Sequence, residues 1–232
     1  MYHSPSKEQS AEKTNEASDD AAEAFGQLLV AMIIDKSGSM SSLTTDTVGG
    51  FNEYLADRQR ETPDALMSVT LFDTERDEMH VAKPMSEIPK LTEERYRQGG
   101  MGYTALNDAI GGTIAAIDAG DYAKGRKVLV VVMTDGRENA SKEWTSRAEI
   151  AKLVKRKEDA GWKFVFFGAN IEAFSEGESL SIPVSRSVQY KASPQGTSDS
   201  FRKMSRASRL YAEGKLEKTW VAELSKDEPE NN

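Results

Sequence analysis

Short apolar runs alternate along this chain with longer stretches in which apolar residues recur at helical spacing. The runs Leu28 to Ile34 and Lys127 to Met133 are apolar almost throughout, which is typical of parallel strands that are covered by helices on both faces. A further strand is expected at Lys163 to Phe167. These three segments predict buried strands of one sheet.

A hairpin is predicted between the first two long apolar runs. Leu66 to Phe72 and Glu78 to Ala82 both alternate between apolar and polar residues, and the polar segment Asp73 to Asp77 separates them. Alternation of this kind with a polar turn indicates two paired strands. A weaker pattern near Val184 to Tyr190 predicts a sixth strand.

Helices are expected in the segments between the strands. From Thr45 to about Arg60, apolar residues recur at helical spacing, and the pattern ends before Pro63. Four more helices are expected: one with Leu106, Ile110, Ile114 and Ile117 on one face, one around Ala148 to Ala160, a short one near Glu172, and one from about Ser198 to Ala212. Strands that alternate with helices predict an α/β fold, with a mostly parallel sheet and helices on both faces.

The two ends of the chain differ in composition from its centre. Residues 1–24 and 214–232 are polar and rich in acidic side chains, with too few apolar groups to form a core. We therefore expect a disordered acidic tail over 1–24, one folded domain over 25–213, and a polar tail over 214–232. A length of 232 residues suits a single domain with tails.

The composition of the chain indicates which partners and which cellular compartment are expected. The chain has 30 basic and 38 acidic residues, a net charge of −8, which disfavours binding to nucleic acid. It has no cysteine, so disulfides and thiolate metal sites are excluded, and this composition suits a reducing cytoplasm. Because no signal-peptide pattern or membrane-spanning apolar stretch is found, we expect a cytoplasmic protein without membrane contact.

Polar side chains with metal-binding chemistry follow both long apolar runs. Asp35, Ser37 and Ser39 come directly after the first run, Asp135 follows the second, and Thr104 ends a glycine-rich loop. The carboxyl ends of strands form the edge where open α/β sheets bind ligands. Two carboxylates and three hydroxyls are hard oxygen donors, which favour Mg²⁺, with Mn²⁺ or Ca²⁺ as alternatives.

These five positions resemble the metal ion-dependent adhesion site of von Willebrand factor A domains. The resemblance implies that Ser37 and Ser39 coordinate the ion directly and that Thr104 does so directly or through water. It implies mostly water-mediated contacts for Asp35 and Asp135. It also implies a Rossmann-like, six-stranded sheet with one antiparallel edge strand, which the predicted hairpin supplies.

The resemblance covers about Phe25 to Tyr211, and this stretch also looks like the compact bacterial members of the family. Three further segments are similar to those members: Gly49-Gly50-Phe51-Asn52, Thr104-Ala105-Leu106-Asn107-Asp108-Ala109-Ile110 and Gly168-Ala169-Asn170. The chain departs from integrin-type domains after the motif, where Met40 to Leu43 lacks the acidic residues of an adjacent calcium site. We therefore predict no second ion.

The predicted function is binding rather than catalysis. Neutral hydroxyl ligands leave the ion strongly electrophilic, so an open octahedral position favours an Asp, Glu or terminal carboxylate from a protein partner. One alternative is a structural or assembly component, including an accessory subunit of a larger machine. A Mg²⁺-dependent phosphatase is disfavoured, because Ser37 stands where such enzymes place a second acid after the nucleophilic aspartate.

Simpler explanations apply to other polar residues. Serines after a strand often cap the next helix, and Thr104 is also placed to cap a helix. Asp108 is expected to have a structural role at the start of a helix, while Asp46 and Asp73 are expected to be ordinary carboxylates of turns or helix starts. Basic residues on the last predicted helix indicate a solvated face more strongly than an interaction surface. They are Arg202, Lys203, Arg206 and Arg209.

Overall fold

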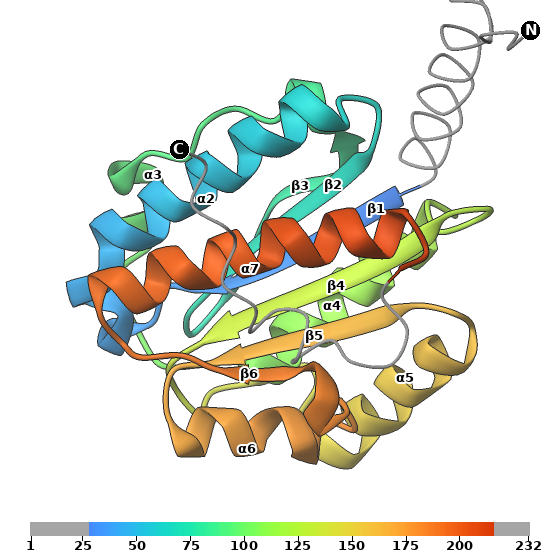
Figure 1. Cartoon of the computed structure of the whole chain (residues 1–232). Helices are drawn as coiled ribbons and strands as arrows, with labels where there is room; N and C mark the ends of the chain where they lie inside the picture. The colour runs from blue at the N-terminus through green and yellow to red at the C-terminus, as the bar shows by residue number, and fades with distance from the viewer. Residues whose placement is uncertain (1–27, 216–232) are drawn as a thin grey trace, which may run out of the picture.

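A computed structural model (Figure 1) describes residues 28–215, except for the side chains of residues 171–174. The predicted N-terminal tail and nearly all of the predicted C-terminal tail lie outside the described residues. Within the described part, no helix has the length and apolar character needed to cross a membrane.

The centre of the molecule is a six-stranded sheet with the order β3-β2-β1-β4-β5-β6. All neighbouring strands run parallel except β2 and β3, which form the antiparallel hairpin at one edge. The predicted sheet is therefore confirmed. Its strands are β1 Leu28–Asp35, β2 Leu66–Phe72, β3 Arg76–Pro84, β4 Lys127–Thr134, β5 Lys163–Gly168 and β6 Ser187–Gln189.

Helices cover both faces of the sheet, as Figure 1 shows for the face that carries α2 and α7. On this face, α7 contacts both α2 and β4, and α3 also contacts α2; α4, α5 and α6 lie on the other face. The α-helices are α2 Thr44–Glu61, α3 Glu93–Arg97, α4 Leu106–Ala119, α5 Arg147–Asp159, α6 Ile171–Ser179 and α7 Pro194–Ala212. Short 3₁₀ helices are η1 Gly38–Leu43, η2 Met85–Glu87 and η3 Val184–Arg186.

Apart from the 3₁₀ helices and small shifts of element ends, the structure differs from the predicted elements in three places. Helix α3 lies within a segment expected to be loop, and it begins where the Thr92 hydroxyl accepts a hydrogen bond from the Arg95 amide. Helix α7 begins several residues earlier than predicted, because Ser193 caps it and Pro194 suits its first turn. Strand β6 is shorter than predicted, because η3 occupies the start of that segment.

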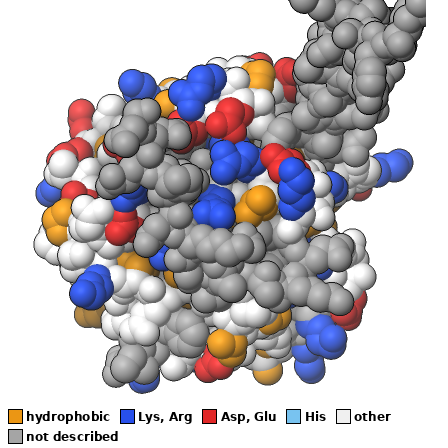
Figure 2. All heavy atoms as spheres, in the orientation of Figure 1, with side chains coloured by type: hydrophobic (Ala, Val, Ile, Leu, Met, Phe, Trp, Pro, Cys, Tyr) orange, Lys and Arg blue, Asp and Glu red, His pale blue; other side chains and the backbone are white. Residues whose placement is uncertain are grey.

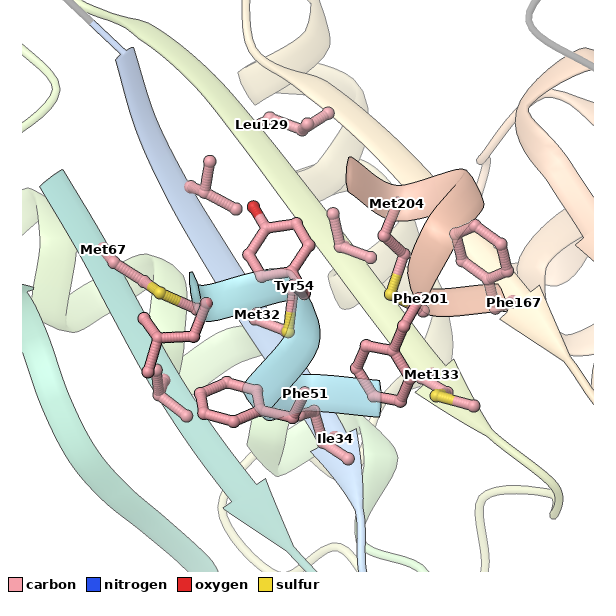
Figure 3. Packing of buried hydrophobic residues seen from close by; sticks show 14 of the residues in the cluster. Met32, Ile34, Phe51, Tyr54, Met67, Leu129, Met133, Phe167, Phe201 and Met204 are labelled. Atoms are coloured by element: carbon pink, nitrogen blue, oxygen red, sulfur yellow. The ribbon is translucent and has the colours of Figure 1, made fainter. Parts of the chain in front are cut away.

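The core beneath α2 and α7 is apolar and closely packed (Figure 3). Phe51 and Tyr54 of α2 and Phe201 of α7 are at most 1% exposed and lie over the strands of the sheet. A Cβ atom on Gly50 would lie only 2.4 Å from the Phe201 ring, so the two helices approach closely because that residue is glycine. Burying a ring of this size stabilises the fold by about 1.5–3 kcal/mol.

The outer face of α7 carries charges of both signs rather than a uniform basic surface. Arg202 forms an ion pair with Asp199 one turn earlier, and Figure 2 shows acidic side chains among the Lys and Arg side chains on this side of the molecule. This mixture fits the solvated face that the sequence indicated.

Candidate functional site

The loops that follow β1 and β4 meet at the carboxyl edge of the sheet, where the order of the strands reverses. Ser39 Oγ donates to Asp135 Oδ1 at 2.5 Å, and the hydroxyl oxygens of Ser37 and Ser39 are 3.3 Å apart. Asp35 Oδ1 accepts a hydrogen bond from the Ser37 amide at 2.7 Å. The structure thus brings four of the five predicted metal-site residues into one connected group.

Thr104 approaches this group from the loop before α4. A Cβ atom on Gly136 would lie 3.1 Å from Thr104 Oγ1, which places that hydroxyl beside the Asp135 loop. The amide of Thr104 donates to Asn139 Oδ1 at 2.8 Å, and the amide of Asn139 donates to the Thr104 carbonyl at 2.9 Å. All five predicted residues therefore lie together, while their role as metal ligands stays a prediction.

The two carboxylates of the group differ in exposure, since Asp35 is buried and Asp135 is partly exposed. Asp35 is fully buried, and burial raises its pKa to about 6 although Thr134 and Ser37 donate hydrogen bonds to it. Burial also raises the pKa of Asp135. A cation close to both groups would favour their charged forms and oppose these shifts. The electrostatics of the site therefore suit a bound cation.

Two buried tyrosines lie close to the same carboxylates. The Tyr96 hydroxyl donates to the backbone carbonyl of Asp35 at 2.5 Å. The Tyr190 hydroxyl is buried without a hydrogen-bond partner. Burial, followed by the charges of Asp135 and Asp35, raises the pKa of Tyr190. Buried polar atoms normally have a partner, and water molecules around a hydrated cation would provide one here.

The donor set fits a hard divalent ion. It combines two carboxylates with three neutral hydroxyls, all oxygen donors of the kind that Mg²⁺ and Ca²⁺ accept. Among the described side chains, no cluster of three or more His, Cys, Asp or Glu residues is arranged to hold a metal. Any cation at this edge therefore depends on the hydroxyls of Ser37, Ser39 and Thr104 as well as on the two carboxylates.

A buried ion pair joins the first loop to its neighbours, and sequence reasoning missed it. Lys36 Nζ lies 3.3 Å from Asp73 Oδ2 and donates to the carbonyl of Gln98 at 2.6 Å. The Lys36 and Asp73 side chains are only 4% and 7% exposed. Asp73 is therefore more than an ordinary turn carboxylate, and its position directly after a buried strand was the available signal.

Asp108 and Glu138 fasten the loop after β4 to the start of α4. Asp108 accepts backbone hydrogen bonds from three consecutive residues, 142 to 144, at 2.7–3.1 Å. Glu138 accepts the Asn107 amide at 2.7 Å. Asp108 thus has a structural role, as expected, but it acts by anchoring a loop rather than through the helix dipole alone.

Glycines in α4 allow a side chain from the loop after β4 and one from the start of β3 to pack against the helix. A Cβ atom on Gly111 would lie 2.4 Å from the Trp144 ring, and one on Gly112 would lie 1.9 Å from the Arg76 guanidinium. Side chains at either position would push these neighbours away. The two glycines therefore help to place the loop after β4 and the start of β3 against α4, the helix that follows Thr104.

A pocket of about 540 Å³ lies beside the metal-site group, toward the β2–β3 hairpin. Lys36 and Gly102 line it, and these residues adjoin the Ser37 loop and the Thr104 loop in the chain. The rest of the lining comes from residues 73–77, Arg95 and residues 98–101. The pocket and the metal-site group therefore share two loops.

Comparison with known proteins identifies the fold. No protein-family model and no curated protein sequence match this chain. Among solved structures, proximal thread matrix protein 1 from the mussel byssus, with a zinc-occupied MIDAS motif, is similar with a TM-score of 0.61 and 16% identity over 82% of this chain. The match spans 46% of the mussel protein, less than half of its length.

Two further solved structures are similar to this chain. One is the vWF domain of the type V pili tip protein Mfa5 from Porphyromonas gingivalis, with a TM-score of 0.62 and 9% identity, over 80% of this chain and 96% of that one. The other is a von Willebrand factor type A structure from Catenulispora acidiphila, with a TM-score of 0.53 and 17% identity, over 79% and 43% of the two chains.

Proposed function

Because the chain has the von Willebrand factor A fold, we propose that it is a protein-binding module that depends on a divalent cation, Mg²⁺ in the first instance. The observation that carries this proposal is the contact of Ser39 with both Ser37 and Asp135. It brings hydroxyl and carboxylate oxygens from two loops together at the β1/β4 edge.

The residues of the site have distinct roles in this proposal. The hydroxyls of Ser37, Ser39 and Thr104 would hold the ion, and Asp35 and Asp135 would supply negative charge, mostly through water. Thr134 and the Ser37 amide keep the Asp35 carboxylate in place with bonds of 2.5 and 2.7 Å. A bound cation supplies electrostatic attraction for a carboxylate. An Asp, a Glu or a chain terminus of the partner would fill the open position.

Recognition without turnover suits the groups that the site offers. Ser37 lies two residues after Asp35 and cannot supply the second acid of an aspartate-based phosphatase. The buried Asp35 carboxylate already accepts two hydrogen bonds and is directed into the fold. We propose that the chain binds its partner and does not transform it.

Calorimetry with Mg²⁺, followed by binding of a short peptide with a single Asp, tests this function. The wild type should bind the peptide in Mg²⁺ and release it when a chelator is added. Thr104→Ala or Ser39→Ala should weaken both Mg²⁺ binding and peptide binding by about ten-fold or more, since substituting even the residues that only support a metal's ligands has an effect of this size. Ser42→Ala is the matched control, because Ser42 is an exposed serine of the adjoining η1 helix. Peptide binding that survives chelator and Thr104→Ala would contradict the proposal.

The likeness to a pilus tip domain, which covers 96% of that chain, favours assembly as a second candidate function. In that case the ion would stabilise the fold and would not capture a partner. A melting temperature that does not respond to Mg²⁺ or chelator, with self-association of the purified chain, would favour this candidate over metal-dependent recognition.

A further inference from the structure

Tyr103 is an exposed aromatic residue next to the metal-site group. It is 70% exposed, more than any other large hydrophobic residue whose side chain the structure describes. It directly precedes Thr104 in the chain. Exposed tyrosines are common anchors in protein interfaces, because they offer a large contact area with little loss of conformational entropy.

The tip of the β2–β3 hairpin is joined to the Tyr103 loop. The Tyr103 amide donates to Thr74 Oγ1 at 2.9 Å, and a Cβ atom on Gly102 would lie 2.1 Å from that same oxygen. Thr104 and Glu75 are each one residue beyond this contact, so their Cα atoms are at most about 15 Å apart. An extended peptide covers this distance in about four or five residues.

The charges that line the neighbouring pocket leave one negative group unmatched. Lys36 pairs with Asp73, and Arg95 forms two bonds of 2.5 and 2.8 Å with Asp77. The remaining cation of the lining, Arg76, pairs with two glutamates outside the pocket, Glu78 and Glu143.

Glu75 lines the same pocket and is exposed. Among residues 28–215, no side chain forms an ion pair with its carboxylate. The pocket therefore offers a negative charge to a partner, and the −8 net charge of the chain also favours a partner with basic groups.

We propose that the bound partner segment continues from the metal-site group across Tyr103 into this pocket and carries a Lys or Arg side chain about three to five residues from its metal-binding acid. This inference rests on the proposed function and specifies its partner. The basic side chain would lie against the Tyr103 ring and pair with Glu75, since cations are attracted to aromatic faces and to carboxylates.

Three short synthetic peptides test this specificity in the presence of Mg²⁺. Each contains one Asp, and the residue about four positions away is Arg, Gln or Glu in an otherwise identical sequence. Fluorescence anisotropy with the full chain should show the Arg peptide binding about three-fold more tightly than the Gln peptide, as for an exposed ion pair. The Glu peptide should bind most weakly.

Variants separate the two contacts. Glu75→Gln should remove the preference for Arg over Gln, and Glu75→Lys should reverse the order so that the Glu peptide binds more tightly than the Arg peptide. Tyr103→Ala should weaken the Arg peptide by about ten-fold. Tyr122→Ala is the matched control, because Tyr122 is an exposed tyrosine between α4 and β4, at the opposite edge of the sheet.

The outcomes distinguish this inference from the proposed function. If all three peptides bind equally in Mg²⁺ and are released by chelator, the basic-residue preference is wrong and the metal-dependent function stands. Equal effects of Tyr103→Ala and Tyr122→Ala would also overturn the inference. If no peptide binds in a metal-dependent way, the proposed function fails and the inference fails with it.

Discussion

Two regions of this molecule reach a fixed geometry by different means. Beneath α2 and α7, apolar side chains such as Phe51 and Phe201 fill the space over the sheet (Figure 3). At the carboxyl edge, buried charged groups organise the loops instead, through the Lys36–Asp73 pair and the bonds that Asp108 accepts. Stability and ligand geometry should therefore respond differently to substitutions in the two regions.

The difference has a physical origin. Apolar packing has little directional preference and tolerates small shifts, whereas a buried carboxylate requires donors at particular distances and angles. Loops that must present oxygens to one ion need support from such directional hydrogen bonds. The apolar region should thus determine how stable the domain is, and the polar edge should determine where Thr104 and Asp135 lie.

The largest expected effect comes from the apolar region. Phe201→Ala removes a side chain that is 1% exposed and leaves a cavity between α2 and α7, so the free energy of unfolding should fall by about 3–5 kcal/mol. Denaturant unfolding measures the loss. Mg²⁺ affinity of the folded fraction should stay within about two-fold, as for independent sites; a large loss of affinity would show that the two regions are coupled.

Asp73→Ala should combine a stability loss with a binding loss. It leaves the Lys36 ammonium buried without its carboxylate, which costs about 3 kcal/mol. It also removes the Asp73 acceptor of the Gly102 amide, so the Thr104 loop should shift and Mg²⁺ should bind more weakly. The double variant Lys36→Met, Asp73→Leu should regain part of the stability but not the affinity, measured by unfolding and calorimetry on the same samples.

Asp108→Asn should lower the stability by a smaller amount, and the substitution again acts at the carboxyl edge of the sheet. The substitution keeps the size of the side chain but replaces charged acceptors of three amides, so the unfolding free energy should fall by about 1–2 kcal/mol. Asp46→Asn is the matched control, since Asp46 lies in the first turn of α2 away from these loops. Equal losses in the two variants would contradict an anchoring role for Asp108.

The smallest effect is expected at the partly exposed Arg95–Asp77 pair. Hydrogen bonds from Arg95 lower the pKa of Asp77, so its contribution to stability is complete above the unfolded pKa of about 3.9 and is lost as the pH falls through the lower folded value. Asp77→Asn should destabilise the protein at neutral pH by at most about 1 kcal/mol after solvent screening. In urea unfolding, the difference in unfolding free energy between Asp77→Asn and the wild type should disappear in acid. A difference that does not change with pH would contradict the charge-based explanation.

Local patterns along the chain were sufficient for the architecture. Continuous apolar runs, alternation and helical spacing correctly predicted six strands and the principal helices, because each pattern reports which faces of an element are buried. They missed the short helix α3 and the start of α7, where a single cap decides whether a turn becomes helical. Element boundaries depend on such individual hydrogen bonds more than on periodicity.

The metal-site candidates were also readable from the chain, because Asp35 and Asp135 directly follow buried strands and parallel strands end at a common edge. The tertiary structure alone decided how that site is supported and bordered. Lys36 meets Asp73 across 37 positions of sequence, and Asp108 meets the loop after β4 across more than 30. Such pairings arise only when separate elements pack, because the local sequence around Lys36 or Asp108 does not specify a distant partner.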